Sequence, residues 1–171
     1  MRVYECENEY EGQTGICSGL SALFCVNALN GIPETMPNHA AGAAIQTASV
    51  LAHHHAGPGA GGAAQLQAVL AGAHLQLTGR YYTQKGWVLL GFPPGIGTVW
   101  YVKGEGHAVA QALVNGFFYH YEPEVGLFKS NSKYEWMMEV TEMYDGLVVD
   151  LGSGPYNFLA RDWVRCQVIR A

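Results

Sequence analysis

The chain is poor in charged residues and lacks the features of several protein classes. Only 13% of its 171 residues are charged, and its formal net charge is −5. Because the sequence has no basic stripe, we do not expect a nucleic-acid partner. No run of about 18 apolar residues occurs, so the sequence predicts no membrane span. With 49% hydrophobic residues, residues 1–171 instead indicate one globular domain with a well-buried core.

Cysteine is scarce, and its spacing excludes the common metal and redox motifs. The four cysteines are Cys6, Cys17, Cys25 and Cys166, and no two form a CxxC pair. A zinc ribbon or a thioredoxin-type motif is therefore not expected, and the wide scatter of the thiols favours the reduced form. The three consecutive histidines at 53–55 cannot all face one metal from a helix, because neighbouring side chains are about 100° apart. We expect them at a polar helix end, and we expect no metal or organic cofactor.

The first twelve residues, MRVYECENEYEG, are acidic and aromatic. They lack the apolar core and the small-residue cleavage site of a secretory signal peptide. We interpret them as a surface strand or an extended lead-in. A protein without a classical signal peptide is expected either in the cytoplasm or outside the cell by a specialised secretion route.

The hydrophobic period changes from helical to alternating near residue 75. A capping-box pair, Ser132 and Glu135, starts a later helix that ends at Gly146. This order predicts an α+β fold, with N-terminal helices packed on a C-terminal antiparallel β-sheet. The expected helices cover 17–30, 38–52, 63–73 and 132–146; the expected strands cover 75–83, 87–92, 98–103, 107–114, 117–123, 148–151 and 164–169.

Cys17 lies at the start of the first predicted helix, in the segment QTGICSGLSALFCVNAL. The first N–H groups of a helix have no partner within the helix, and the positive end of its dipole favours an anion. A thiolate is such an anion, so this position favours a reactive cysteine. The alternative is that Cys17 is simply a small buried hydrophobic residue.

His107 and Glu122 flank the strongest hairpin signal in the chain, Asn115-Gly116. His107 is eight residues before Asn115, and Glu122 is six residues after Gly116. The start of one strand and the end of the next are therefore expected to lie side by side, close enough for a carboxylate to hold an imidazole. A thiol needs a base, and the base needs a third group that fixes its orientation. Cys17, His107 and Glu122 supply these three roles.

Three motifs resemble the YopT/AvrPphB-type cysteine proteases, which are papain-like enzymes that bacterial pathogens or symbionts inject into host cells. They are GICSGLS at 15–21, GHAVA at 106–110 and EPEVGLF at 122–128. The resemblance implies a thiol protease in which Cys17 is the nucleophile, His107 the base and Glu122 the orienting acid. Members of this family usually have aspartate at the third position, so Glu122 departs from the pattern. The resemblance also implies delivery by a specialised bacterial secretion system into the cytoplasm of a host or target cell.

Two further residues have open interpretations. Gln13 lies four residues before Cys17, where a papain-like fold uses an amide as an oxyanion-hole donor beside the cysteine N–H. It is alternatively a solvated turn residue. His120 lies two residues before Glu122 and is expected at the surface of an aromatic strand, or else in contact with substrate.

The function expected from these residues is peptide-bond hydrolysis of a protein or peptide substrate. One alternative is another reaction on the same scaffold, by a peptidoglycan endopeptidase or amidase, a deubiquitinase or an acyl transfer enzyme. A second alternative is a binding module without activity. The intact set of thiol, imidazole and acid argues against that second alternative.

Overall fold

A large antiparallel sheet forms the centre of the protein. The computed structural model describes residues 1–85, 95–104, 106–146 and 161–171. Within them, seven strands are ordered β1-β8-β7-β6-β5-β9-β4, and every neighbouring pair is antiparallel. The strands are β1 (Arg2–Glu5), β4 (Leu75–Lys85), β5 (Val99–Gly104), β6 (His107–Val114), β7 (Phe117–Glu122), β8 (Gly126–Ser130) and β9 (Asp162–Arg170), and a separate small hairpin pairs β2 (Glu9–Tyr10) with β3 (Gln13–Thr14).

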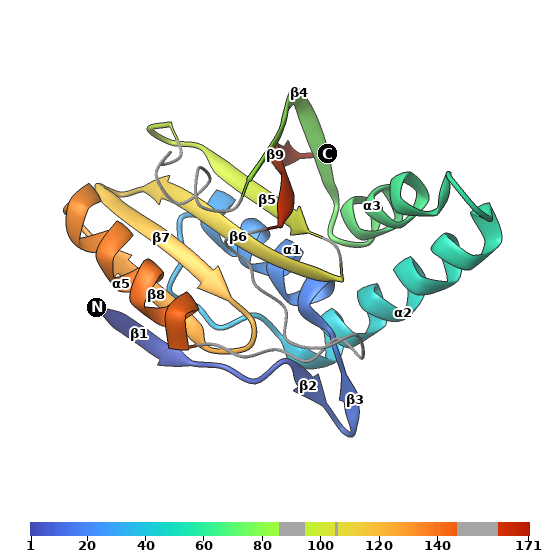
Figure 1. Cartoon of the computed structure of the whole chain (residues 1–171), viewed down its shortest axis with the longest axis horizontal. Coiled ribbons are helices and arrows are strands. Elements are labelled where there is room, and N and C mark those ends of the chain that lie inside the picture. Colours follow the sequence, from blue (N-terminus) through green and yellow to red (C-terminus); the bar gives the residue numbers. More distant parts are fainter. Residues whose placement is uncertain (86–94, 105, 147–160) are drawn as a thin grey trace.

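Helices cover both faces of this sheet. On one face α1 (Cys17–Leu29) packs against the central strands β5 and β6, and α2 (His39–Ala56) and α3 (Gly61–Gly72) pack beside it. On the other face α5 (Lys133–Gly146) packs against β7 and β8 (Figure 1). Successive residues of a strand point to opposite faces. On β7, accordingly, Tyr121 stacks on Phe24 of α1, whereas His120 contacts Trp136 of α5.

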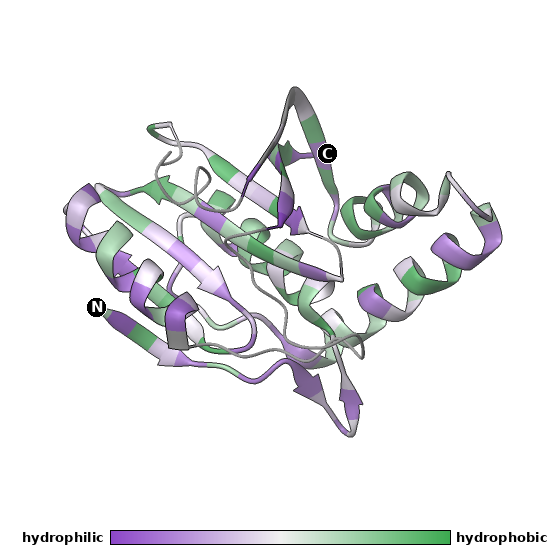
Figure 2. Cartoon of the chain, in the orientation of Figure 1, coloured by the Kyte–Doolittle hydropathy of each residue, from purple (hydrophilic) through white to green (hydrophobic). Residues whose placement is uncertain are grey.

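The described chain has two hydrophobic clusters, one on each face of the sheet. The larger cluster joins α1 to the strands and includes Leu20, Phe24 and Tyr121. The smaller one lies under α5 and includes Trp136 and Trp163. Hydrophobic residues recur along α1, β5 and β6, whereas the β2–β3 hairpin is hydrophilic (Figure 2).

The hairpin between β6 and β7 is the one predicted from the sequence. Asn115 and Gly116 both have positive φ, 53° and 80°, as a two-residue turn of this kind requires. The strands pair from Val114 with Phe117 to Ala110 with Tyr121. This register brings the start of β6 and the end of β7 to the same end of the sheet.

A close approach of two glycines joins α1 to α2. A Cβ atom placed on Gly19 would lie only 2.0 Å from the carbonyl oxygen of Gly42, so the two helices can touch here only through glycine. Asn38 caps α2, because its Oδ1 accepts a hydrogen bond of 2.9 Å from the N–H of Ala41. The cap and the glycine contact together fix where Gln46, one turn after Gly42, meets the start of α1.

The predicted fold class and most predicted elements are confirmed. The helices at 17–30, 38–52 and 63–73 correspond to α1, α2 and α3, and the predicted cap at Ser132 accepts a hydrogen bond from the N–H of Glu135. The strands predicted at 87–92 and 148–151 lie outside the described residues. All four cysteines are free thiols. None of the described helices is long and apolar enough to cross a membrane.

Candidate active site

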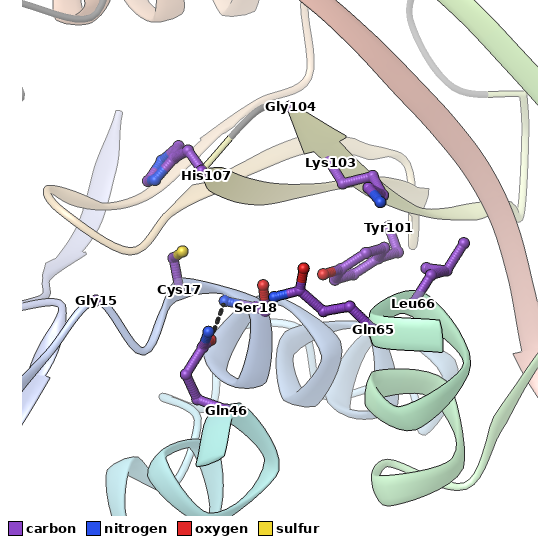
Figure 3. Close-up of a pocket in the computed structure, with 11 residues that line it drawn as sticks. Gly15, Cys17, Ser18, Gln46, Gln65, Leu66, Tyr101, Lys103, Gly104 and His107 are labelled. Carbon is purple, nitrogen blue, oxygen red and sulfur yellow. Dashed lines mark hydrogen bonds between the residues drawn. The ribbon is translucent and has the colours of Figure 1, made fainter. Parts of the chain in front are cut away.

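The Cys17 thiol lies where the loop from β3 enters α1. Gly15, two residues earlier, has φ of 69°, a conformation that side chains with a Cβ rarely adopt. Cys17 is then the first residue of the helix, and its neighbour Ile16 offers no side-chain cap. The thiol therefore lies beside N–H groups that have no partner within the helix. Cys17 is 5% exposed and lines a cavity between α1, α2, α3 and the ends of β5 and β6 (Figure 3).

His107 lies across this cavity from Cys17 (Figure 3). It is the first residue of β6 and follows Gly106, whose φ is 72°. Its side chain is 2% exposed, and its Nε2 is 2.7 Å from Oε1 of Glu122. Interaction with the Cys17 side chain contributes to the raised pKa of this ring. Because Nε2 meets the carboxylate, Nδ1 is the nitrogen left for the thiol.

The hydroxyl of Ser21 connects the nucleophile helix to the histidine strand. Its Oγ donates a hydrogen bond of 3.1 Å to the carbonyl oxygen of Ala108, and Ser21 is fully buried. Ser21 is one turn after Cys17, and Ala108 follows His107. The bond therefore holds α1 against β6 right beside the thiol and the imidazole, which gives the serine of the GICSGLS motif a physical role.

Glu122 ends β7 and is completely buried. Its Oε1 accepts hydrogen bonds from His107 Nε2 and from the N–H of Glu124 at 3.1 Å, and its Oε2 accepts one of 3.2 Å from the hydroxyl of Tyr144. The β6–β7 register would place residue 124 opposite His107, so Glu122 is its diagonal neighbour. Diagonal neighbours are about 7–8 Å apart, a distance that the longer glutamate arm spans more readily than aspartate.

The electrostatics of His107 favour the protonated ring. Burial by itself would lower the pKa of His107, but the charge of Glu122 and the side-chain interactions with Cys17 and Glu122 outweigh it, and the pKa is raised well above its usual value. An imidazolium at neutral pH is the counter-ion that a thiolate requires. The other three thiols have the opposite environment, because burial raises the pKa of Cys6, of Cys25 and of Cys166, the last to about 12.

The predicted oxyanion donor Gln13 lies elsewhere. Its Nε2 donates to the carbonyl oxygen of Ala43 at 3.3 Å and to Oγ1 of Thr47 at 3.2 Å, both on α2. The amides of Gln46 and Gln65 line the cavity, and that of Gln46 lies beside the start of α1, where its Oε1 accepts a hydrogen bond of 3.0 Å from the N–H of Ser18 (Figure 3). The backbone donor identifies this atom as oxygen, so Nε2 is the donor atom of the Gln46 amide.

Sequence reasoning missed Gln46 because nothing local marks it. It lies in a small-residue helix, 29 positions after Cys17. Only the approach of Gly19 to Gly42 brings the two together. The spacing of those glycines, one on each predicted helix, was the single available signal.

The prediction for His120 is wrong. His120 is fully buried, with its Nδ1 3.2 Å from Gln111 Nε2 and its Nε2 2.8 Å from the Tyr144 hydroxyl. It therefore lies neither at the surface nor among the residues that line the described cavity. The strand alternation was correct, but the face that His120 shares with Glu122 is covered by α5. In the described parts of the chain no group of three or more His, Cys, Asp or Glu side chains could hold a metal.

Comparison with known proteins supports the fold. No protein-family model matches the sequence, and no curated protein matches it significantly. The chain is similar in structure to the Pseudomonas avirulence protein AvrPphB, whose crystal structure aligns with a TM-score of 0.66 and 16% sequence identity. The alignment covers 90% of this chain and 91% of the AvrPphB chain. The resemblance inferred from the motifs is thus confirmed at the level of the fold, and the chain has an α+β architecture similar to that of AvrPphB.

Proposed function

We propose that this protein is a papain-like thiol protease with Cys17 as nucleophile, His107 as base and Glu122 as orienting acid. The observation that carries the proposal is the position of His107. This buried ring lies across the cavity from the Cys17 thiol on one side (Figure 3) and is hydrogen-bonded to a carboxylate, 2.7 Å away, on the other. A thiol, an imidazole and an orienting acid in this order are the arrangement that nucleophilic acyl transfer requires.

The arrangement accounts for each step of peptide hydrolysis. The Cys17 thiolate attacks the substrate carbonyl carbon and forms a C–S bond, while the negative charge moves to the carbonyl oxygen. The His107 imidazolium then gives its proton to the leaving amine as the C–N bond breaks. The now neutral His107 takes a proton from water, and the resulting hydroxide attacks the thioester; the C–S bond breaks, the acid product leaves, and the Cys17 thiolate and His107 imidazolium are restored. Glu122 keeps the ring oriented throughout and stabilises its charged form.

The developing oxyanion needs hydrogen-bond donors at the start of α1. The backbone N–H of Cys17 is the first donor in the proposal. The second donor expected from the sequence is the Gln13 amide. The Gln46 amide is the candidate that its position favours, because it lines the cavity beside Ser18. These two amides are distinguished by the variants described in the Discussion.

A protein or peptide is the proposed substrate class. The fold is that of a Pseudomonas avirulence protein, and this likeness favours a secreted bacterial effector over a housekeeping enzyme. We accordingly propose that the protein is delivered by a specialised secretion system into another cell. A translocation reporter fused to the chain tests this part separately.

The test of the function compares wild type with Cys17→Ala and Cys25→Ala in cells. Cys25 is on the same helix and completely buried, so its variant controls for loss of a thiol. New protein N-termini with wild type and Cys25→Ala, but none with Cys17→Ala, would support proteolysis and identify the cleaved bond. Full biological effect of Cys17→Ala would instead favour a binding module.

A second readout separates proteolysis from other acyl chemistry. If iodoacetamide labels Cys17 selectively but no new N-termini arise, the thiol is activated for a different carbonyl. Ubiquitin conjugates, peptidoglycan fragments and acyl thioesters are then the substrates to assay, one for each alternative reaction.

A further inference from the structure

A chain of buried polar side chains leads from β9 to Glu122, on the face of the sheet that α5 covers. Arg165 Nη2 is 2.5 Å from Gln111 Oε1, Gln111 Nε2 is 3.2 Å from His120 Nδ1, and His120 Nε2 is 2.8 Å from the Tyr144 hydroxyl. The Tyr144 hydroxyl is 3.2 Å from Glu122 Oε2. No member of this polar chain is more than 8% exposed.

The two ends of the polar chain determine where every proton lies. Arg165 carries only donors, so Gln111 must accept with Oε1 and donate with Nε2. His120 therefore accepts at Nδ1 and carries its proton on Nε2, which donates to the Tyr144 oxygen. The single proton of Tyr144 is then directed to Glu122, which as a carboxylate can only accept.

A neutral His120 fits this assignment. The pKa of His120 is lowered to about 4, mainly by burial. The charge of Glu122 opposes this shift in part, and the charges of His107 and Arg165 add to it. Among the residues that the structure describes, these charged groups and the Tyr144 hydroxyl on α5 are the titratable groups that face the ring. His120 is therefore a fixed single-proton link and does not compete with His107 for a proton near neutral pH.

We propose that Tyr144, His120, Gln111 and Arg165 form a positioning network that holds Glu122 against His107 and requires a carboxylate, rather than an amide, at position 122. The proposal rests on the roles proposed above for His107 and Glu122. All donors of the network point towards Glu122, and hydrogen bonds in such a chain polarise one another in a buried site.

An amide at position 122 would oppose this direction. Its single oxygen would be needed by His107 and by the N–H of Glu124, which both donate to Oε1. Its NH2 group would then face the Tyr144 hydroxyl, whose proton would have to turn towards His120. His120 would then accept at Nε2 and carry its proton on Nδ1. Because Arg165 keeps the Gln111 Nε2 group turned towards His120, two donors would face each other there. The network thus accounts for an acid where a papain-like site elsewhere can use an amide.

The test uses nitrogen-15 NMR of histidine-labelled protein and needs no substrate. His120 is expected as a neutral ring with its proton on Nε2 at every point between about pH 5 and 8, the range in which an ordinary histidine titrates. A proton on Nδ1, or a doubly protonated ring at about pH 7, would overturn the proposed direction. Because this measurement is made on the wild type, it does not depend on the folding of a variant.

The second measurement is the rate of Cys17 alkylation by iodoacetamide in Tyr144→Phe. This change removes only the hydroxyl and its hydrogen bond to the Glu122 carboxylate. Because that bond acts on the thiol only through Glu122 and His107, its loss is expected to slow alkylation at about pH 7 by roughly three- to tenfold. The half-maximal rate is expected to move to higher pH, because a looser carboxylate stabilises the imidazolium less. A merely structural role would leave this pH midpoint unchanged.

Tyr119→Phe is the matched control. Tyr119 is also on β7 and is 1% exposed, but it belongs to the cluster on the α1 face. Its variant is expected to keep the wild-type rate and midpoint. A wild-type pH profile in Tyr144→Phe would overturn the positioning role. An unreactive Cys17 in the wild type would instead overturn the proposed function, and the His120 tautomer would still report on the network.

Discussion

Replacing Glu122 by glutamine separates the charge of the acid from its shape. The glutamine side chain has the same length and still offers an oxygen to His107 Nε2, which is 2.7 Å from the carboxylate in the wild type, but it carries no charge. A hydrogen bond to a charged group contributes about 1.5–3 kcal/mol and a neutral one about 0.5–1.5 kcal/mol. The difference between the two ranges, about 1–1.5 kcal/mol, corresponds to roughly a five- to tenfold change. We therefore expect the rate of Cys17 alkylation at about pH 7 to fall roughly five- to tenfold.

The same variant has a defined effect on stability. The pKa of His107 is raised in the folded protein, with Glu122 as the main cause that opposes burial. A raised histidine pKa stabilises the fold fully below its unfolded value of about 6.5, and this contribution is lost as pH rises through the folded pKa. The free energy of unfolding lost in Glu122→Gln should therefore be larger at low pH than at high pH.

Urea denaturation at several pH values measures the free energy of unfolding. Iodoacetamide treatment of the same protein samples measures the rate of Cys17 alkylation. Glu124→Gln is the control, because Glu124 is exposed and its Oε1 accepts a hydrogen bond of 2.8 Å from Asn8 Nδ2, which an amide oxygen can also do. A loss of stability in Glu122→Gln that is independent of pH, together with an unchanged alkylation rate, would refute the coupling of this carboxylate to the imidazolium.

Three other perturbations test separate parts of the site. Mass spectrometry after brief iodoacetamide treatment should find Cys17 labelled well before the other three thiols; uniform labelling would contradict an activated thiolate. Gln46→Ala should lower turnover by about 10²–10³, the effect of losing one oxyanion donor, while Gln13→Ala should not, and the reverse result would restore the assignment made from the sequence. Gly19→Ala should destabilise the fold by about 1–3 kcal/mol in thermal denaturation, because its Cβ would lie 2.0 Å from a carbonyl oxygen; Gly72→Ala, where the nearest atom is 3.2 Å away on a side chain, should not.

The parts of the site predicted from the sequence are those encoded by local signals. The start of α1 at Cys17 follows from an apolar period of 3.6 after a glycine, and the pairing of β6 with β7 follows from Asn115-Gly116. Both signals act over a few residues, so His107 and Glu122 could be paired by counting from the turn. The structure adds that the pairing is diagonal, which a count alone does not resolve.

The parts that were missed depend on contacts between elements distant in sequence. Gln46 reaches the start of α1 because two glycines allow the helices to touch. His120 is buried because α5, which begins 13 residues later at Lys133, folds back over β7. Strand alternation placed His120 on the same face as Glu122, but whether that face meets water or a helix is decided by tertiary packing.

The position of α5 also bears on the departure from aspartate at position 122. A diagonal acid must reach further to meet His107, and a longer side chain has one more rotatable bond to be held. Tyr144 of α5 supplies that restraint through Oε2, while the N–H of Glu124 restrains Oε1. The length of residue 122 and the hydroxyl at position 144 are therefore linked features. The shorter side chain of an aspartate at position 122 would place its carboxylate further from both His107 and the Tyr144 hydroxyl. Glutamate is therefore the acid that fits this combination of hairpin register and covering helix.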